Sequence, residues 1–489
     1  MSLVYDLIVI GGGAAGVTAA DTGRTFGLKT LLLEEQVDLG GNIYRNIEYI
    51  AKAEPKLYAA LGENYLAGKE IFGKYARSPD DTWCDTQVWH LDQSGMIGIL
   101  RGGTAEFLQA KRVVVASGAM ERPVPIPGWT LPGVLTAGAC QTLLKSSALA
   151  PAFPTVLAGS GPLLLLLACQ LLALGAPLKA VVLTTPLRQY LAGLRELFAV
   201  VQSPQSLLKG LSWLAQIRRG GVPIYSGAKS LSIRGDDRAT GLEFWSGGHS
   251  HSLDGEIILL HEGLVPNTSL TMASDCDHEW DERQLCWRPK TNVWGQTSAG
   301  MIYVAGDCSR ILGADAAPLS AALSVLAIAC DLGRIPPLER NRMAQPLEKA
   351  LRKLQRFRRF LDTIYRPPSA IGAHIADDTI VCRCEGVSAG AIRQVIKLKC
   401  VGPNQAKSFT RCGMGPCQGR MCGLAVTEIF AHELGKQQKD VGHYRIRPPI
   451  KPLTLEEFAG AVQFSEITPS KGMLMLALNA RASGITTSE

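Results

Sequence analysis

The sequence predicts an α/β protein with two nucleotide-binding βαβ units and a small helical, cysteine-rich unit toward its C-terminal end. Two glycine-rich turns, at residues 11–16 and 159–164, each follow a short apolar run and precede a helix-like run. A strand, a glycine turn and a helix in this order are typical of a nucleotide-binding βαβ unit. Five cysteines, Cys382, Cys384, Cys412, Cys417 and Cys422, fall in one short stretch, and this clustering indicates metal ligation more than disulfides.

The overall composition is that of a globular protein with several domains. The chain has 489 residues, of which 46% are hydrophobic and 19% charged, so it is too long for one core and too apolar to be disordered. The charge of +7 is spread along the chain and does not indicate nucleic-acid binding. The 13 cysteines, several of them in apolar runs, favour a reducing, cytoplasmic location. The longest apolar run, residues 163–176, is shorter than the ~20 residues of a membrane span, and we expect neither a transmembrane segment nor a signal peptide.

The first glycine turn is the strongest cofactor signal. It follows a predicted buried strand at residues 5–10, and a helix is expected from Ala14 to about residue 26. The glycines would permit a tight turn, close approach of a pyrophosphate and close packing of helix on strand. An acidic residue ends the next predicted strand, residues 28–33, where a carboxylate can bind ribose hydroxyls. The cofactor-binding residues predicted here are Gly11, Gly13, Ala14, Ala15, Gly16, Glu34 and Glu35.

Two later segments favour FAD as the cofactor of this unit. A strand at residues 301–305 runs into Gly306-Asp307 and is followed by an alanine-rich helix from about residue 314. Taken alone, Asp307 could be a turn or helix-capping residue. Paired with the first glycine turn, it is interpreted as a contact to the ribityl chain or the phosphates of FAD. A strand at residues 112–116 ends in a second short loop, which adds Ala116, Ser117 and Gly118 to the predicted site.

The second glycine turn keeps the βαβ pattern but not the full dinucleotide signature. Gly159 and Gly161 are present, whereas Leu164 stands in the place of the third glycine. The matching strand, residues 180–183, ends in Thr184-Thr185 and not in an acid. NAD(P), ATP, another nucleotide and no ligand therefore all stay open for Gly159 and Gly161. His261 and Glu262, at the end of a further strand, are interpreted as structural.

The C-terminal cysteines match the ligand number of a [2Fe-2S] cluster. A Cys-x-Cys pair and, about thirty residues later, a Cys-x4-Cys pair supply four thiolates, and zinc is the competing metal. The predicted ligands are Cys382, Cys384, Cys417 and Cys422, with Cys412 as an alternative to Cys422. No Cys-x2-Cys or Cys-x4-Cys accompanies the nucleotide motifs, so disulfide reduction is not supported, and we expect no catalytic residue in this chain.

These signals divide the chain into five parts. We expect a discontinuous FAD-binding domain, a second nucleotide-binding domain that interrupts it, an amphipathic connector with a solvated basic face, a cysteine-rich domain and a tail. The predicted ranges are 1–150 with 265–335, then 151–264, 336–375, 376–434 and 435–489.

Several motifs together resemble a known family. They are Gly40-Gly41-Asn42-Ile43-Tyr44-Arg45, Gly118-Ala119-Met120-Glu121-Arg122-Pro123, Pro127-Gly128-Trp129, Leu131-Pro132-Gly133-Val134, Ala137-Gly138-Ala139-Cys140-Gln141, the cysteine-rich stretch and Arg445-Ile446-Arg447-Pro448-Pro449. They are similar to the α subunits of heteromeric dye-linked dehydrogenases, which include opine (octopine, nopaline), D-hydroxyproline and L-proline dehydrogenases and the B component of hydrogen cyanide synthase. Sarcosine oxidase α is a more distant relative. The similarity covers nearly the whole chain, although the family often has Asp at position 34 and Gln at position 42.

The resemblance implies a fold and a division of labour. The fold would be a glutathione-reductase-like flavoprotein with two dinucleotide-binding domains, followed by a [2Fe-2S] domain like bacterioferritin-associated ferredoxin. FAD would contact Gly41 and Asn42 in addition to the residues above. A β subunit of the D-amino-acid-oxidase type, with its own FAD, would oxidise an opine, hydroxyproline or related amine. Some members also hold FMN at the subunit interface, bind ATP in the second fold or recruit a small ferredoxin-like γ subunit.

The predicted activity is therefore electron transfer within an oxidoreductase that acts on CH–NH donors. A quinone or dye would accept the electrons, and any attachment to the inner membrane would come through the complex. The alternatives are a stand-alone NAD(P)H:acceptor reductase, which Leu164 and Thr184 disfavour, an enzyme similar to anaerobic glycerol 3-phosphate dehydrogenase, and an iron–sulfur scaffold or carrier, which would leave the FAD signature unexplained.

Overall fold

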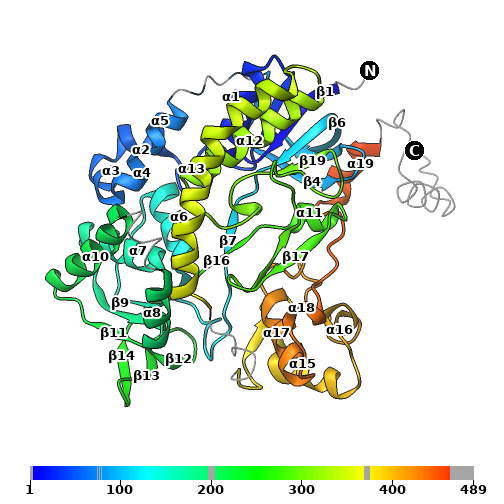
Figure 1. Cartoon of the computed structure of the whole chain (residues 1–489). Helices are drawn as coiled ribbons and strands as arrows, with labels where there is room; N and C mark the ends of the chain where they lie inside the picture. Colours follow the sequence, from blue (N-terminus) through cyan, green and yellow to red (C-terminus); the bar gives the residue numbers. More distant parts are fainter. Residues whose placement is uncertain are drawn as a thin grey trace, which may run out of the picture.

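Each of the two predicted nucleotide-binding units is built around its own sheet (Figure 1). The computed structural model describes residues 4–73, 75, 78, 80–196, 204–367 and 375–462, and the fold is reported for these residues. Their arrangement confirms the predicted α/β fold with two βαβ units and a small helical unit toward the C-terminal end.

The first sheet has seven strands and carries the first glycine turn. β1 pairs in parallel with β2 and β6, β2 pairs in parallel with β3, and β6 pairs in parallel with β19. β4 and β5 complete the sheet as antiparallel strands. Helices α1 and α12 pack together on this sheet (Figure 1). The bounds are β1 Val4–Ile10, α1 Ala14–Thr25, β2 Thr30–Leu33, β3 Thr82–Trp83, β4 Thr86–Leu91, β5 Met96–Arg101, β6 Thr104–Val115, β19 Ile302–Val304 and α12 Ala316–Asp331. Four short helices follow β2: α2 Ile47–Ala53, α3 Pro55–Leu61, α4 Glu63–Leu66 and α5 Gly68–Phe72.

The second sheet has five parallel strands in the order β11-β10-β9-β15-β8. A three-stranded antiparallel sheet, β12-β13-β14, belongs to the same unit. The bounds are β8 Val134–Thr136, α6 Ala137–Ser147, β9 Thr155–Ser160, α7 Pro162–Ala173, β10 Leu178–Leu183, α8 Leu187–Gly193, α10 Pro204–Arg219, β11 Ile224–Ser226, β12 Lys229–Arg234, β13 Gly241–Ser246, β14 His249–Asp254 and β15 Ile257–Glu262. The apolar run at 163–176 thus forms the buried helix α7.

The predicted boundary at residue 150 does not follow the sheet pairing. β8 and α6 precede residue 150, yet β8 pairs with β15 of the second sheet, and α6 packs on that strand. The two units are joined by an antiparallel ladder of β7 (Ala119–Glu121) with β16 (Leu264–Pro266). The chain therefore enters the second unit after β7 and leaves it before β16.

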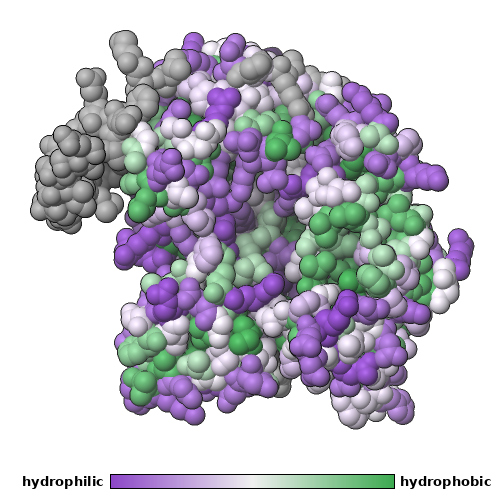
Figure 2. Space-filling view, turned by 180° about the vertical axis from the view of Figure 1, so that it is seen from behind, coloured by the Kyte–Doolittle hydropathy of each residue, from purple (hydrophilic) through white to green (hydrophobic). Residues whose placement is uncertain are grey.

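The remaining elements connect the two units to the cysteine-rich unit. Helix α13 (Pro337–Ile364) contacts both α12 and α8, so the predicted connector spans the two nucleotide-binding units (Figure 1). The cysteine-rich unit contains β20 Ile380–Cys382, β21 Val387–Ser388, α15 Ala389–Lys397, α16 Pro403–Thr410, α17 Gly423–Glu433 and α18 Gln438–Val441. The following chain returns to the first sheet, where α19 (Leu455–Val462) packs on β6. From behind, the molecule is hollowed near its middle, above two separate lower lobes (Figure 2).

No helix within the described residues is long and apolar enough to cross a membrane.

Candidate functional site

The predicted FAD residues converge on the N-terminal end of helix α1. Gly11 has φ +107°, and a Cβ there would lie 2.5 Å from the backbone oxygen of Ala116, at the end of β6. A Cβ on Gly16 would lie 1.7 Å from the oxygen of Gly11, so only glycine lets this helix sit so close to the strand. Gly306 lies against Ala15, because its Cβ would come within 2.9 Å of the Ala15 Cβ. Segments from three parts of the chain thus meet at one turn.

The turn also has the open cradle that a pyrophosphate needs. A Cβ on Gly13 would meet only the Cα of Gly41, at 3.8 Å. No side chain caps α1, and its first turn contains no acidic residue, so its N-terminal amides remain available to an anion. These features fit the phosphates of FAD at the residues predicted for them.

Glu34 lies where a ribose-binding carboxylate is expected. Its Oε2 accepts a hydrogen bond of 2.5 Å from the amide of Gly12, and its Oε1 accepts one of 2.8 Å from Gln36. Burial raises the pKa of this carboxyl group above its ordinary value, although the two amides oppose the shift. Glu35 instead pairs with Lys451 at 2.5 Å, so the structure directs it toward the chain that follows the cysteine-rich unit.

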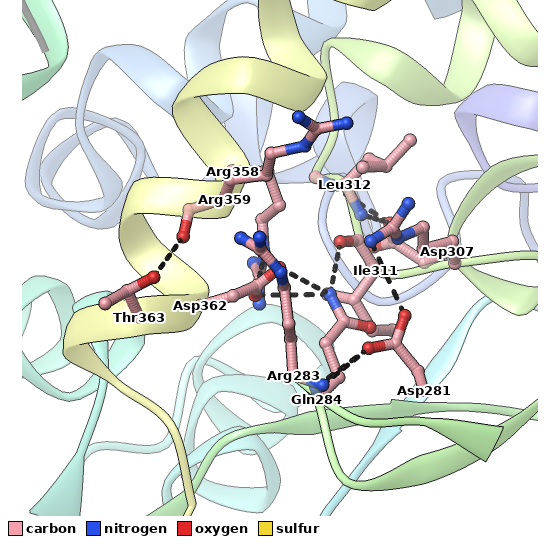
Figure 3. A network of polar contacts seen from close by, with 12 residues as sticks. Asp281, Arg283, Gln284, Asp307, Ile311, Leu312, Arg358, Arg359, Asp362 and Thr363 are labelled. Carbon is pink, nitrogen blue, oxygen red and sulfur yellow. Dashed lines mark hydrogen bonds and ion pairs between the residues drawn. The ribbon is translucent and has the colours of Figure 1, made fainter. Parts of the chain in front are cut away.

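Asp307 belongs to a loop that a polar network holds in place (Figure 3). Its Oδ1 accepts hydrogen bonds from the amides of Leu312 and Gly313, at 2.8 and 3.0 Å. Gln284 donates both to the backbone oxygen of Ile311 in this loop and to the buried Asp362 of α13. The connector helix therefore helps to fix the loop, a role that its basic, amphipathic sequence did not reveal.

Sequence reasoning missed a buried lysine beside the predicted flavin residues. Lys145 lies on α6 and is only 4% exposed. Its Nζ donates to the backbone oxygen of Asn42 at 3.1 Å and to Oε1 of Gln141 at 3.2 Å. Burial, reinforced by the charge of Arg45, lowers the pKa of Lys145 to about 7. No local pattern could have indicated this contact, because Lys145 and Asn42 are 103 residues apart.

Two of the four predicted cysteine ligands, Cys382 and Cys422, lie together with the alternative ligand Cys412. The sulfur atoms of Cys382, Cys412 and Cys422 lie within 4.8 Å of one another, and all three residues are buried. Cys384 is exposed and interacts with the half-buried Cys417. Hydrogen bonds from Cys412 and Cys422 lower the pKa of the Cys382 thiol far below its ordinary value. Thiolates are the form that binds iron or zinc, so this donor set fits either metal.

Two glycines of this loop pack under an aromatic ring. Gly413 and Gly419 lie under the ring of Tyr444, where a Cβ would come within 2.7 and 2.5 Å of it. The backbone amide of Gly413 also hydrogen-bonds to Cys382. Tyr444 is 3% exposed and covers the cysteine loop. Gly415 packs on Cys384, since its Cβ would lie 2.2 Å from the Cys384 Cβ. Tyr444 therefore contributes to the centre, although no cysteine motif includes it.

Comparisons with known proteins identify the class first. Residues 5–324 match the family described as Pyridine nucleotide-disulphide oxidoreductase, and residues 377–461 match the Sarcosine oxidase A3 domain. The chain is thus an oxidoreductase with a flavoprotein fold that implies FAD. L-proline dehydrogenase from P. horikoshii shares the fold, with a TM-score of 0.65 at 19% identity over 93% of this chain and 79% of that one.

Curated relatives identify the family. The A subunit of opine oxidase from Rhizobium meliloti is 40% identical over 93% of this chain and 87% of its own length. The same opine oxidase subunit from Agrobacterium tumefaciens (strain Ach5) is 39% identical over 94% and 92%. Hydrogen cyanide synthase subunit HcnB from Pseudomonas aeruginosa is 30% identical over 92% and 97%. The chain belongs to the family of these opine oxidase and hydrogen cyanide synthase subunits, which confirms the resemblance seen in its motifs.

Proposed function

We propose that this chain is the electron-transfer subunit of a heteromeric dye-linked dehydrogenase, with FAD at the first glycine turn and a [2Fe-2S] cluster at Cys382, Cys384, Cys417 and Cys422. The observation that carries the proposal is the continuity between the two sites. The buried cysteines share one hydrophobic core with Ile10 and Val115, which end the strands beside the FAD turn. A cysteine centre fixed to a flavin unit in this way is suited to exchange electrons with it.

The chemistry of the two groups explains why one chain would combine them. When bound, FAD takes up electrons in pairs and a [2Fe-2S] cluster passes them singly, so together they would connect hydride removal to a one-electron acceptor such as a quinone or dye. The residues of this chain would hold the two groups, exclude water and fix their separation. Removal of hydride from the CH–NH group of an opine, hydroxyproline or similar amine would occur in the partner.

The partner that we propose is a β subunit of the D-amino-acid-oxidase type with its own FAD. The relatives support a heteromeric complex, because they are named as subunits of opine oxidase and hydrogen cyanide synthase. Further components for the same complex are FMN at the interface and a small, ferredoxin-like γ subunit. Cytoplasmic location fits the free, largely buried cysteines of the described chain.

The proposal is tested by the source of the electrons. NADH is added anaerobically to the purified chain while the flavin absorbance is followed. We expect no bleaching by NADH, and rapid bleaching when an opine or hydroxyproline is added together with the β subunit. Rapid reduction by NADH alone would instead establish an NAD(P)H:acceptor reductase, and purification without any flavin would favour an iron–sulfur scaffold.

The metal is tested separately. Iron and acid-labile sulfide in equal amounts, with the electron paramagnetic resonance signal of a reduced [2Fe-2S] cluster, are expected, whereas zinc without sulfide would contradict this assignment. Cys422→Ser should lose or alter that signal, and Cys412→Ser should retain it. The reverse result would make Cys412 the fourth ligand.

A further inference from the structure

Trp129 connects the second nucleotide-binding unit to the strand that leads into the cysteine centre. It ends the motif Pro127-Gly128-Trp129, which belongs to neither of the two proposed cofactor sites, on the loop after β7 (cyan in Figure 1). Gly128 has φ +79°, and a Cβ there would lie 2.5 Å from the backbone oxygen of Ile233, so this loop packs closely on the second unit. Trp129 is 6% exposed and belongs to the hydrophobic core of the same unit.

The indole ring of Trp129 makes two contacts with the segment that carries the Cys-x-Cys pair. Its Nε1 donates a hydrogen bond of 2.6 Å to the backbone oxygen of Ile380, the first residue of β20. The guanidinium carbon of Arg383 lies 5.4 Å from the centre of a Trp129 ring, within the range of a cation–π interaction. Cys382 ends β20, so both contacts are made within two residues of a predicted ligand.

The positive charge of Arg383 is not neutralised by a neighbouring acid. Arg383 stands between the two cysteines of the Cys-x-Cys pair, and it is exposed. The acid of this loop, Glu385, pairs instead with Arg411 at 2.9 Å. Arg383 makes no ion pair with another described residue. The aromatic face of Trp129 therefore holds a cation whose field no carboxylate cancels, directly beside two predicted ligands.

We propose that Trp129 is a positioning residue for the cysteine centre: it holds the charge of Arg383 beside the Cys-x-Cys pair and thereby raises the reduction potential of the cluster. Reduction adds a negative charge to a [2Fe-2S] cluster, so a fixed cation nearby stabilises the reduced form. The second unit thus influences the potential, although none of the predicted ligands belongs to it. The inference rests on the proposed [2Fe-2S] cluster and holds with either candidate for the fourth ligand.

The competing interpretation is that Trp129 only packs the loop against β20. Redox titration of the full chain, followed by the electron paramagnetic resonance signal of the reduced cluster, distinguishes the two. Trp129→Leu removes both contacts, Trp129→Phe keeps an aromatic face for the cation, and Arg383→Gln removes the charge. The double variant Trp129→Leu/Arg383→Gln tests whether one residue acts through the other. The matched controls are Trp245→Leu, at a 53% exposed position on β13, and Lys397→Gln, at an exposed position on α15.

The proposal predicts a lower potential that depends on the charge of Arg383. Arg383→Gln should lower the equilibrium constant for reduction about tenfold, a shift of about 59 mV for a one-electron couple. Trp129→Leu should lower it about threefold, because the released side chain moves into solvent, and the double variant should match Arg383→Gln. Trp129→Phe and both controls should stay near the parent. An unchanged potential in Arg383→Gln, or additive shifts in the double variant, would overturn the proposal.

Release of the bound metal to a chelator separates this inference from the identity of the metal. Trp129→Leu should release metal faster than Trp245→Leu, because only the former loses the hydrogen bond to Ile380. Zinc without sulfide in the parent chain would refute the proposed cluster, and equal release rates for these two variants would refute the positioning role with either metal. Thermal unfolding checks that each variant folds. Arg383→Gln changes an exposed side chain, so it tests the charge even if Trp129→Leu loses the cluster.

Discussion

Replacing Lys145 by methionine tests whether a buried amine that loses its charge near pH 7 lies beside the predicted flavin residues. The side chain is 4% exposed, and its two hydrogen-bond acceptors, the backbone oxygen of Asn42 and Oε1 of Gln141, are uncharged. Burial, then the charge of Arg45, lowers the pKa of Lys145 to about 7. In the unfolded chain the same amine titrates near its ordinary value of about 10.4.

The direction of the pH dependence follows from the protonation of Lys145 in the folded and unfolded states. Between about pH 7 and pH 10 the folded protein has released the Lys145 proton, while the unfolded chain still binds it. The free energy of unfolding therefore rises with pH in this window, by about 1.4 kcal/mol per pH unit. From pH 7 to 9.5 the parent chain should gain about 3 kcal/mol relative to Lys145→Met, which has no proton to release.

Thermal unfolding at several pH values measures this difference. Cooperative unfolding of 489 residues has an entropy of about 1 kcal/mol/K, so the gap between parent and variant should change by about 3 °C. Lys397→Met, at an exposed position on α15, is the control and should follow the parent at every pH. Parallel curves for the parent and Lys145→Met would show that Lys145 is not shielded from water in the folded protein.

Three further substitutions give results that the structure fixes in advance. Gly16→Ala should abolish flavin absorbance and lower the melting temperature, because the new Cβ would overlap the backbone oxygen of Gly11. Gly210→Ala in α10 is the control: its Cβ would meet no atom within 4 Å, so this variant should be neutral or stabilising. Tyr444→Ala should lower the free energy of unfolding by about 3–5 kcal/mol and release iron. Tyr444→Phe keeps the ring over the cysteine loop, so its free energy of unfolding should stay within about 1 kcal/mol of that of the parent. Burial raises the pKa of Glu262 from 4.5 to about 7. Between pH 4.5 and pH 7 the folded protein therefore keeps a proton that the unfolded chain has lost, and the free energy of unfolding falls as the pH rises through this range. Glu262→Gln has no such proton, so the decrease in its free energy of unfolding over this pH range should be smaller by about 2–3 kcal/mol. The same pH profile of unfolding for the parent and the variant would contradict the burial of this carboxyl group.

The elements predicted correctly from the sequence are those whose signals are contiguous. The strand, glycine turn and helix around residues 5–26 need only neighbouring residues, because apolar runs define the strand and the glycines define the turn. The same holds for α7 and for the strand before Asp307. The boundary at residue 150 misses β8 and α6, since membership of a sheet depends on pairing with β15, more than a hundred residues away.

The contacts that complete the sites are non-local and leave no pattern. His261 pairs with Glu121, which is 140 residues away in the sequence. Lys145 looks like an ordinary helix residue until the fold brings it to Asn42. Tyr444 meets the cysteine loop only because the chain after α18 turns back over Gly413 and Gly419.

The cysteine centre shows why spacing alone could not select its fourth ligand. Cys412 and Cys422 both lie within reach of Cys382, so distance does not separate them, and the sequence offers each the same thiol. Cys384 and Cys417 form a separate outer pair, because Cys384 interacts with Cys417 and packs on Gly415. A cluster that takes two sulfurs from this outer pair needs two from the buried three. Cys382 belongs to the Cys-x-Cys pair with Cys384, so the choice lies between Cys412 and Cys422, and the serine variants at these two positions decide it.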